Sequence, residues 1–214
     1  RRMMPLTKNL PKPLIEINGI TLLDNSINFL KKLGCKDIVI NTHYQHQKIK
    51  ESIDRRSDKK IITLIYENDI LDTGGGVKNI LPYIKNKNLI VSNSDIFWQK
   101  ENLLDAKKLL KLFLKKKLPS LLLVNKKKSY GLNKNNGDFF LNDNKVMRYK
   151  KGEQVFFYTG LQILPTEIIN NFSQKKFSLN YVWDFLINLE KLYGEEMDSN
   201  WYHVGDIQGL AIAK

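Results

Sequence analysis

The feature that most constrains the fold is an alternation between short β-rich apolar runs and amphipathic segments at helical spacing. Residues 21–33 place Leu22, Ile27 and Leu30 on one stripe and end before Gly34, which predicts a helix. The same pattern predicts strands at residues 37–42, 60–66, 88–93 and 120–124, and helices at residues 45–54, 77–84 and 103–116. Parallel strands need crossover helices between them, so we expect an α/β fold with a doubly wound, mostly parallel sheet covered on both faces.

The pattern changes beyond residue 125. A hairpin is expected around residues 142–144, joining strands at 139–141 and 146–149. A strand at 155–164, a helix at 179–192 and a last strand at 201–205 follow. Because no linker or repeat interrupts the sequence, we expect a single domain over residues 1–214, with residues 126–214 forming a small β extension of the same sheet.

Composition excludes several classes of protein. The chain has 214 residues, of which 42% are hydrophobic and 27% charged, so it can bury a core as a soluble globule. Its apolar runs, such as residues 121–124, are far shorter than a membrane span, and no signal peptide opens the sequence, so a cytoplasmic protein is expected. The single cysteine, Cys35, excludes an internal disulfide. Any metal must therefore be bound by oxygen or imidazole ligands.

The net charge is strongly positive. Lys+Arg 35 against Asp+Glu 22 leaves +13, which raises nucleic acid, an anionic membrane or phosphorylated small molecules as partners. The lysine clusters at residues 115–117 and 126–128 lack the interleaved aromatic side chains and arginines that nucleic-acid readout usually needs. Nucleic-acid binding is therefore disfavoured, and the charge alone does not choose between the other partners. A nucleic-acid binder stays the alternative, and it would show strongly salt-dependent affinity for unrelated oligonucleotides.

Polar residues follow several of the predicted strands, where ligands of open α/β sheets bind. Asp95 comes just after the apolar strand at residues 88–93, where a carboxylate is costly unless it binds something. Carboxylate oxygens suit Mg²⁺, which also bridges substrate phosphates. The alternative for Asp95 is a turn or helix-cap role. His43 and His46 have no third ligand beside them, so surface or helix-cap roles are expected for both.

Five short motifs occur in an order found in one enzyme family. They are RMMPLT at residues 2–7, PKPL at 11–14, LDTGGGVKN at 71–79, NSD at 93–95 and WYHVG at 201–205. Together they resemble the signature of the sugar-1-phosphate nucleotidyltransferases, or nucleoside-diphosphate-sugar pyrophosphorylases, over essentially the whole chain. The resemblance implies the Rossmann-like nucleotide-diphospho-sugar transferase fold. In that family a strand and the start of a glycine-rich loop precede the first motif, so both are expected upstream of residue 1.

The resemblance also implies an activity. These enzymes join a nucleoside triphosphate to a sugar 1-phosphate, release pyrophosphate and use Mg²⁺. The short bacterial uridylyltransferases are the most similar subgroup, which implies UTP and N-acetylmuramate 1-phosphate as substrates. Alternatives are GTP with mannose 1-phosphate, or a non-catalytic relative that binds a nucleotide or sugar phosphate. A monomer or homodimer without nucleic-acid or membrane partners is expected, with residues 1–125 binding the nucleotide and 126–214 the sugar.

The family motifs assign roles to individual residues by resemblance. Catalytic roles on the triphosphate fall to Arg2 and Lys12, nucleotide contacts to Thr73, Gly74, Gly75 and Asn93, sugar contacts to Gly137, Asp138, Thr159 and Gly160, and metal binding to Asp95 and His203. His203 stands where family members usually present a second carboxylate. It is therefore either a metal ligand or a structural histidine. The glycine triplet at residues 74–76 has a second interpretation as a simple turn that starts a helix.

Overall fold

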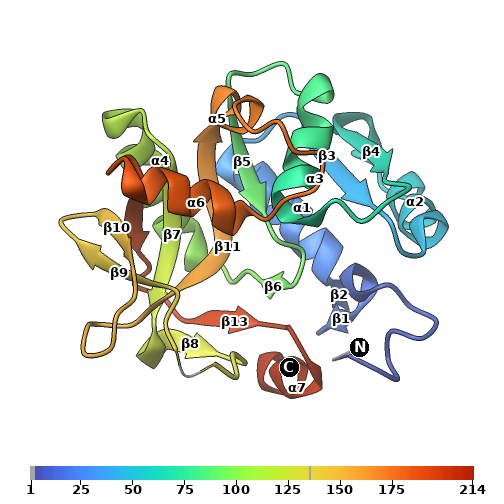
Figure 1. Ribbon diagram of the computed structural model, residues 1–214. Coiled ribbons are helices and arrows are strands. Elements are labelled where there is room, and N and C mark those ends of the chain that lie inside the picture. The colour runs from blue at the N-terminus through green and yellow to red at the C-terminus, as the bar shows by residue number, and fades with distance from the viewer. Residues whose placement is uncertain (1–2, 135) are drawn as a thin grey trace.

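The computed structural model describes residues 3–134 and 136–214, so Arg2 lies outside the described residues. Its largest sheet has six strands in the order β5-β11-β7-β12-β10-β9. These strands are β5 (Asn88–Ser92), β7 (Ser120–Asn125), β9 (Phe139–Asn142), β10 (Lys145–Arg148), β11 (Phe156–Pro165) and β12 (Tyr193–Glu196). In Figure 1 strands β3 (Ile38–Thr42) and β4 (Ile62–Tyr66) lie to the right of this sheet and form a parallel pair of their own.

The large sheet is mixed, which corrects the expected mostly parallel arrangement. Strand β11 runs antiparallel to both β5 and β7, and within this sheet only β7 and β12 pair in parallel. Strand β9 also meets β11 at Phe139 and Phe156, which closes β11, β7, β12, β10 and β9 into a ring. Part of the reason is local: β9 and β10 are joined by a two-residue turn without a crossover helix, so these two strands must run antiparallel.

Two smaller sheets complete the strand pairing. Strand β13 (Trp201–His203) lies between β6 (Ile96–Phe97) and β8 (Ser129–Tyr130) in a three-stranded sheet. It is antiparallel to β6 and parallel to β8. Strands β1 (Glu16–Ile17) and β2 (Ile20–Thr21) form a short hairpin near the N-terminal end. The three-stranded sheet is important because it joins the C-terminal strand β13 to the segment that follows β5.

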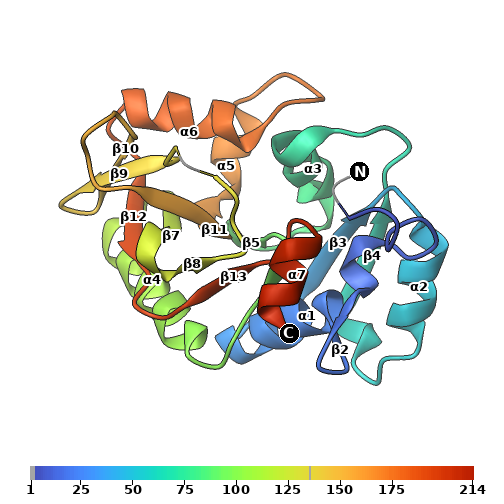
Figure 2. The same ribbon diagram turned by 90° about the horizontal axis from the view of Figure 1, so that it is seen from below.

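Helices cover both faces of the large sheet. The helices of the described chain are α1 (Leu22–Leu33), α2 (His46–Asp54), α3 (Asp72–Ile80), α4 (Asn102–Lys116), α5 (Thr166–Asn170), α6 (Leu179–Asn188) and α7 (Ile207–Ala213), with 3-10 turns η1 (Lys12–Leu14), η2 (Lys59–Ile61), η3 (Leu81–Tyr83) and η4 (Lys126–Lys128). Of these, α2 packs on β4 and α7 on β13, away from the large sheet. Figure 2 shows α6 on one side of β7 and β11 and α4 on the other. Leu121 and Leu123 join the apolar cluster under α6, whereas Leu122 and Val124 join the cluster under α4. Because both faces of β7 are buried, its sequence is continuously apolar.

Local signals predicted several boundaries correctly. Thr21 caps α1 by accepting a hydrogen bond from Asp24 N at 2.9 Å, and Gly34 ends the helix with φ 103°. Asp143 and Asn144 have φ of 47° and 63° and turn β9 into β10, as a two-residue hairpin requires. The predicted helix at residues 77–84 is wrong at its start, because α3 begins at Asp72 and contains the glycine triplet.

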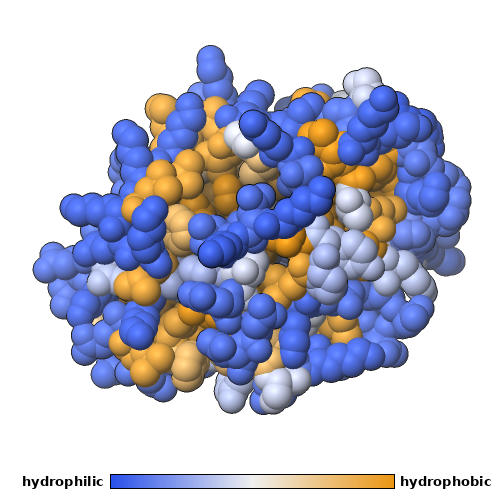
Figure 3. Space-filling view, turned by 90° about the horizontal axis from the view of Figure 1, so that it is seen from above, coloured by the Kyte–Doolittle hydropathy of each residue, from blue (hydrophilic) through white to orange (hydrophobic). Residues whose placement is uncertain are grey.

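The face of the molecule seen in Figure 3 carries both kinds of side chain: hydrophilic residues form most of its outline, and apolar residues gather toward its middle. Within residues 3–134 and 136–214, none of the helices has both the length and the apolar character needed to cross a bilayer.

Arg56 connects α1 to the segment that follows α2. Its Nε and one of its terminal nitrogens donate to the two carboxylate oxygens of Asp58 at 2.8 and 2.9 Å. The guanidinium also pairs with Asp24 and donates to Asn28 Oδ1 at 3.2 Å, so two residues of α1 are tied to it. Lys31 of α1 pairs with Asp58 as well. Hydrogen bonds from Arg56 and Lys31 hold the pKa of the Asp58 carboxyl well below its usual range.

Arg56→Ala should therefore lower the free energy of unfolding at pH 7 by about 1 to 3 kcal/mol, the usual worth of hydrogen bonds to charged groups. Because the pKa of Asp58 is lowered in the folded state, this stabilisation is fully present above the unfolded pKa of about 4 and is lost as pH falls below it. Urea unfolding of both proteins between pH 3 and pH 7 measures the difference. Lys50→Ala, which breaks an exposed pair with Asp54 on α2, is the control and should change stability little. If the difference in unfolding free energy between wild type and Arg56→Ala grew as the pH fell, the stabilising role of the Arg56–Asp58 contact would be contradicted.

Candidate active site

Asp95 lies in the turn between β5 and β6, at the carboxyl end of the apolar strand, as the sequence predicts. Strand β6 pairs with β13 so that Ile96 faces His203. The backbone N–H of Val204 then donates to the carbonyl of Asp95 at 2.8 Å. Because of this pairing, the C-terminal motif lies at the end of β5, next to residues that are far from it in the sequence.

Lys12 reaches the same carboxylate from the N-terminal segment. Its Nζ lies 2.9 Å from Asp95 Oδ2, and His203 Nε2 lies 3.7 Å from the same oxygen. The Lys12 and Asp95 side chains are 26% and 29% exposed, so both can meet a solute. Pro11 and Pro13 flank Lys12 in the 3-10 turn η1, and prolines restrict the backbone that presents its side chain.

A shared apolar cluster places this N-terminal segment against the C-terminal one. Ile15 and Ile17, which follow η1, pack with Val204 of the C-terminal motif and with Leu210 of α7. Burial of these side chains therefore fixes the distance between Lys12 and the end of β13. Side-chain packing, rather than a local sequence signal, assembles the three charged or polar groups.

The charge state of Asp95 follows from its surroundings. Burial alone would raise the pKa of its carboxyl, because a low dielectric disfavours the charged form. Interaction with His203 and the positive charge of Lys12 outweigh burial and hold the pKa below its usual range. The site thus presents a carboxylate anion at neutral pH, next to one fixed cation.

Asp95 and His203 are the two side chains of this site that could bind a divalent ion. Within the described part of the chain, no three His, Cys, Asp or Glu side chains gather into a ligand cluster. The pair Asp95 Oδ2 and His203 Nε2 is 3.7 Å apart, and a single ion with bonds of about 2.0 to 2.2 Å can join them. An ion held by few protein groups and completed by substrate phosphates is the usual pattern in phosphoryl-transfer sites. The residues present fit such an ion.

The structure brings one predicted nucleotide residue and one predicted sugar residue side by side. Asn93 N donates to the carbonyl of Gly160 at 2.8 Å. Gly160 has φ 89°, and a Cβ there would lie 3.1 Å from Asn93 Cβ and 3.0 Å from the Ile96 side chain. Gly160 is therefore needed for close packing of β11 next to the β5–β6 turn.

Thr73, Gly74 and Gly75 lie within α3 and face the segment before α6. The N–H groups of Gly74 and Gly75 both donate to the carbonyl of Phe177, at 2.9 and 3.0 Å. A Cβ at Gly75 would lie 2.5 Å from the Lys175 carbonyl oxygen, so a side chain is excluded. Thr73 Oγ1 accepts from Leu179 N at 2.9 Å. These residues hold α3 and the segment before α6 together.

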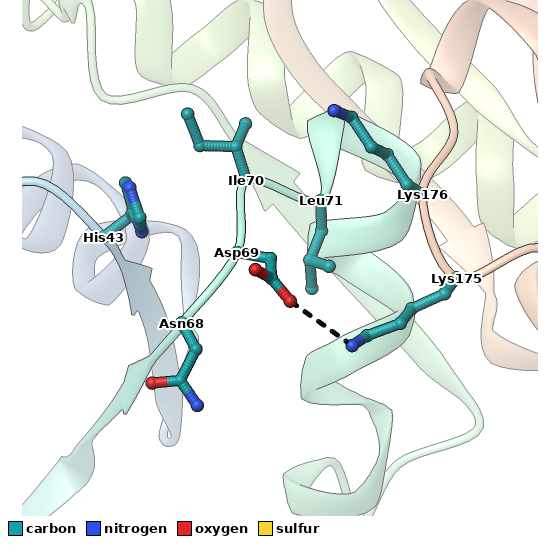
Figure 4. A pocket seen from close by; sticks show the side chains of 7 residues that line it. All are labelled: His43, Asn68, Asp69, Ile70, Leu71, Lys175 and Lys176. Carbon is teal, nitrogen blue, oxygen red and sulfur yellow. Dashed lines mark ion pairs between the residues drawn. The ribbon is translucent and has the colours of Figure 1, made fainter.

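An open pocket of about 540 Å³ borders this junction. It is lined by His43, Asn68, Asp69, Ile70, Leu71, Lys175 and Lys176 (Figure 4). Its walls come from the ends of β3 and β4, where Asn68 to Leu71 connect β4 to α3, and from the two lysines before α6. Lys175 pairs with Asp69 at 3.6 Å across the pocket. The sequence pattern predicts ligand residues just after the strand that ends at Tyr66, but it did not identify the polar residues of this pocket, because they belong to no motif.

The remaining predicted sugar residues have structural partners. Asp138 pairs with Lys134 through one oxygen, and its other oxygen accepts from Tyr158 N at 3.2 Å. Thr159 is fully buried, and its hydroxyl donates to the Leu122 carbonyl at 2.8 Å. A Cβ at Gly137 would meet the Val155 side chain at 2.9 Å. Of the four sugar residues, Gly160 is the one that the described contacts place next to Asn93.

His43 and His46 stand apart from Asp95. His46 lies at the start of α2, with Nδ1 2.7 Å from the Thr42 hydroxyl, and His43 Nδ1 donates to the Glu67 carbonyl at 2.8 Å. His46 thus has the local helix-end environment that the sequence predicts. His43 instead lines the pocket at the end of β3.

Comparison with known sequences gives the family. Residues 1–151 match the nucleotidyl transferase family. An N-acetylmuramate alpha-1-phosphate uridylyltransferase from Caulobacter vibrioides is 27% identical over 220 residues, covering 100% of this chain and 90% of the relative. A D-glycero-alpha-D-manno-heptose 1-phosphate guanylyltransferase from Campylobacter jejuni is 30% identical over 179 residues, covering 83% of this chain and 77% of the relative.

Solved structures share the fold. HddC from Yersinia pseudotuberculosis, in complex with GMP-PN, superposes with a TM-score of 0.75 at 24% identity, covering 95% of this chain and 88% of HddC. The inositol-1-phosphate CTP transferase from T. maritima gives a TM-score of 0.80 at 14% identity, covering 99% of this chain and 89% of that enzyme. With the family match over residues 1–151 and the end-to-end similarity to the C. vibrioides enzyme, the conclusion is that this chain belongs to the nucleotidyl transferase family.

Proposed function

We propose that this chain transfers the uridylyl group of UTP to N-acetylmuramate 1-phosphate. An oxygen of the sugar phosphate attacks the α-phosphorus, a new phosphorus–oxygen bond forms, and the bond to pyrophosphate breaks. The similarity to the C. vibrioides uridylyltransferase supports this pair, because it extends over 100% of the chain. The observation that carries the proposal is the meeting of Lys12, Asp95 and His203 at the carboxyl end of β5.

The three residues suit a reaction between two anions. Phosphoryl transfer depends mostly on positioning and on electrostatic stabilisation, so a fixed cation next to the reacting phosphates is needed. Lys12 supplies a compact positive charge, and the pair with Asp95 holds its ammonium group in place without substrate. A divalent ion at Asp95 would, when bound, neutralise charge on the phosphates. Arg2 remains a predicted second cation on the triphosphate.

We also propose where the nucleotide and the sugar bind in this fold. We place the nucleoside in the pocket lined by residues 68–71, which lead into the first turn of α3, where Thr73 lies, with Asn93 near the ribose and phosphates. The open pocket has walls from two strand ends, where ligands of α/β sheets usually bind. Residues 126–214 would bind the sugar, with Gly160 giving close access beside Asn93.

GTP is the second candidate triphosphate. The C. jejuni guanylyltransferase is 30% identical to this chain over 179 residues, and HddC was solved with GMP-PN. A guanylyltransferase would use a heptose or mannose 1-phosphate as its second substrate. Neither similarity covers as much of the chain as that to the uridylyltransferase, so UTP is preferred.

A pyrophosphate-release screen tests the proposal. UTP, GTP, CTP and dTTP are each crossed with N-acetylmuramate, N-acetylglucosamine, mannose and heptose 1-phosphates, and products are identified by mass spectrometry. UTP with N-acetylmuramate 1-phosphate should give the highest kcat/KM. A higher kcat/KM for GTP with mannose or heptose 1-phosphate would reverse the assignment. Substrate binding without product in every combination would instead indicate a non-catalytic relative.

A further inference from the structure

The imidazole of His203 is held in one orientation. Its Nδ1 lies 3.4 Å from the carbonyl oxygen of Gly131, and since a carbonyl only accepts, Nδ1 carries the hydrogen of this bond. The ring stacks on Trp201, with centroids 5.5 Å apart and planes 21° apart. A Cβ at Gly205 would lie 2.1 Å from His203 Cε1, so only glycine leaves room for the ring there. Gly131 and Gly205 were not singled out by the sequence as supports of a site residue.

This orientation directs the other ring nitrogen at Asp95. With hydrogen on Nδ1, a neutral imidazole has its lone pair on Nε2, which lies 3.7 Å from Asp95 Oδ2. A lone pair and a carboxylate oxygen are both acceptors, so a cation between them makes the contact favourable. Without a metal that cation is a proton on Nε2, which is directed at Asp95 and helps to lower the pKa of its carboxyl, and Lys12 Nζ lies 2.9 Å from the same oxygen. Histidines that bind metals usually donate their second N–H to a carbonyl or carboxylate, which is the arrangement that Gly131 provides. A divalent ion at this place would replace the proton on Nε2 and would share Asp95 Oδ2 with the Lys12 ammonium.

We infer that Asp95 and His203 form a mixed oxygen–nitrogen site that selects a first-row transition ion such as Mn²⁺ over Mg²⁺. The inference rests on the proposed function, because the triphosphate completes the ligand set. Mg²⁺ takes oxygen ligands and keeps its waters, whereas first-row ions also accept imidazole nitrogen. Asp95 alone would serve either ion. The imidazole of His203 stands where the sequence resemblance leads one to expect a second carboxylate. It shifts the preference of the site from Mg²⁺ toward the transition ion.

Pulsed electron paramagnetic resonance on the full chain with Mn²⁺ and UTP tests the site directly. Nitrogen bound to Mn²⁺ produces a ¹⁴N modulation that oxygen ligands do not. The wild-type protein should show this modulation, and His203→Asp should abolish it. His46→Gln is the matched control, since His46 lies at the start of α2, away from Asp95, and it should keep the signal.

Competition between the two ions gives a second measurement. Titration of the UTP-bound protein should show Mn²⁺ binding more tightly than Mg²⁺, and His203→Asp should reduce that ratio by about tenfold or more, the scale of losing an optimised ligand environment. Wild-type Mn²⁺ without ¹⁴N modulation, or a ratio that His203→Asp leaves unchanged, would overturn the inference. Full nucleotidyl transfer with Mg²⁺ but no ¹⁴N signal would overturn it and leave the proposed function standing. A ¹⁴N signal without any transfer product would support the metal pair and reject the proposed reaction.

Discussion

Lys12→Ala should lower kcat/KM by about two to three orders of magnitude, or about 3 to 4 kcal/mol of transition-state stabilisation. The Lys12 ammonium lies 2.9 Å from Asp95 Oδ2, at the strand end where the phosphates are proposed to meet. Negative charge moves onto the leaving pyrophosphate during the reaction, so this contact should strengthen in the transition state. Its loss should therefore lower kcat as well as raise KM, which steady-state kinetics with both substrates separates.

The control for Lys12 is the lysine cluster at the end of α4. Lys115, Lys116 and Lys117 are exposed, and replacing all three with neutral side chains removes more charge than Lys12→Ala does. Asparagine suits position 117, where φ is 58°. This triple variant should change kcat/KM by less than about threefold, because exposed charges are screened within about 8 to 10 Å at ordinary salt. Equal losses for both proteins that shrink together at high salt would show that net charge, not a positioned lysine, binds the phosphates.

Asp95→Ala should lower kcat by at least about a hundredfold, the scale of removing one major electrostatic element. Its carboxylate is the group shared by Lys12 and His203, so the substitution removes the anion that orients the ammonium and that would bind a divalent ion. Asp95→Asn keeps the shape and removes the charge. Its kcat should fall nearly as far as that of Asp95→Ala. Single-turnover measurements on the two variants would then separate the loss of the charge from the loss of packing.

The control for Asp95 is Asp184, which forms an exposed ion pair with Arg148 on the surface of α6. Asp184→Ala should leave kcat within about threefold of wild type, since exposed ion pairs contribute little. Thermal unfolding of each variant checks that the fold is intact. Turnover near the wild-type value in a folded Asp95→Ala protein would show that this carboxylate takes no part in the reaction.

Elements with local signals could be predicted from the sequence. Helix α1 has a capping threonine at one end and Gly34 at the other, and both act through contacts within a few residues. The turn of Asp143 and Asn144 likewise depends on two residues that tolerate positive φ. Elements without such signals were missed. Strand β12 (Tyr193–Glu196) contains a glycine and two glutamates, and only its parallel pairing with β7 makes it a strand.

The pattern of apolar residues also could not predict the relative direction of neighbouring strands. A buried strand reads as a continuous apolar run whether its neighbours are parallel or antiparallel, as Leu121 to Val124 show. The pattern of apolar residues therefore predicted that β7 is covered on both faces, and it could not predict that β11 runs beside it in the opposite direction. The glycine triplet is a similar case. Three glycines disfavour a helix locally, yet packing against Phe177 and Lys175 keeps them within α3.

The sequence by itself determined the α/β class, most helix and strand positions, the family through its ordered motifs, and the place of Asp95 after an apolar strand. These depend on local periodicity and on residue types that can be read in order along one chain. The tertiary structure decided the mixed and closed sheet, the pocket beside α3, and the contacts of Asp95 with Lys12 and His203. Those features depend on strand pairing and apolar packing between segments far apart in sequence, and such contacts leave no pattern in any one segment.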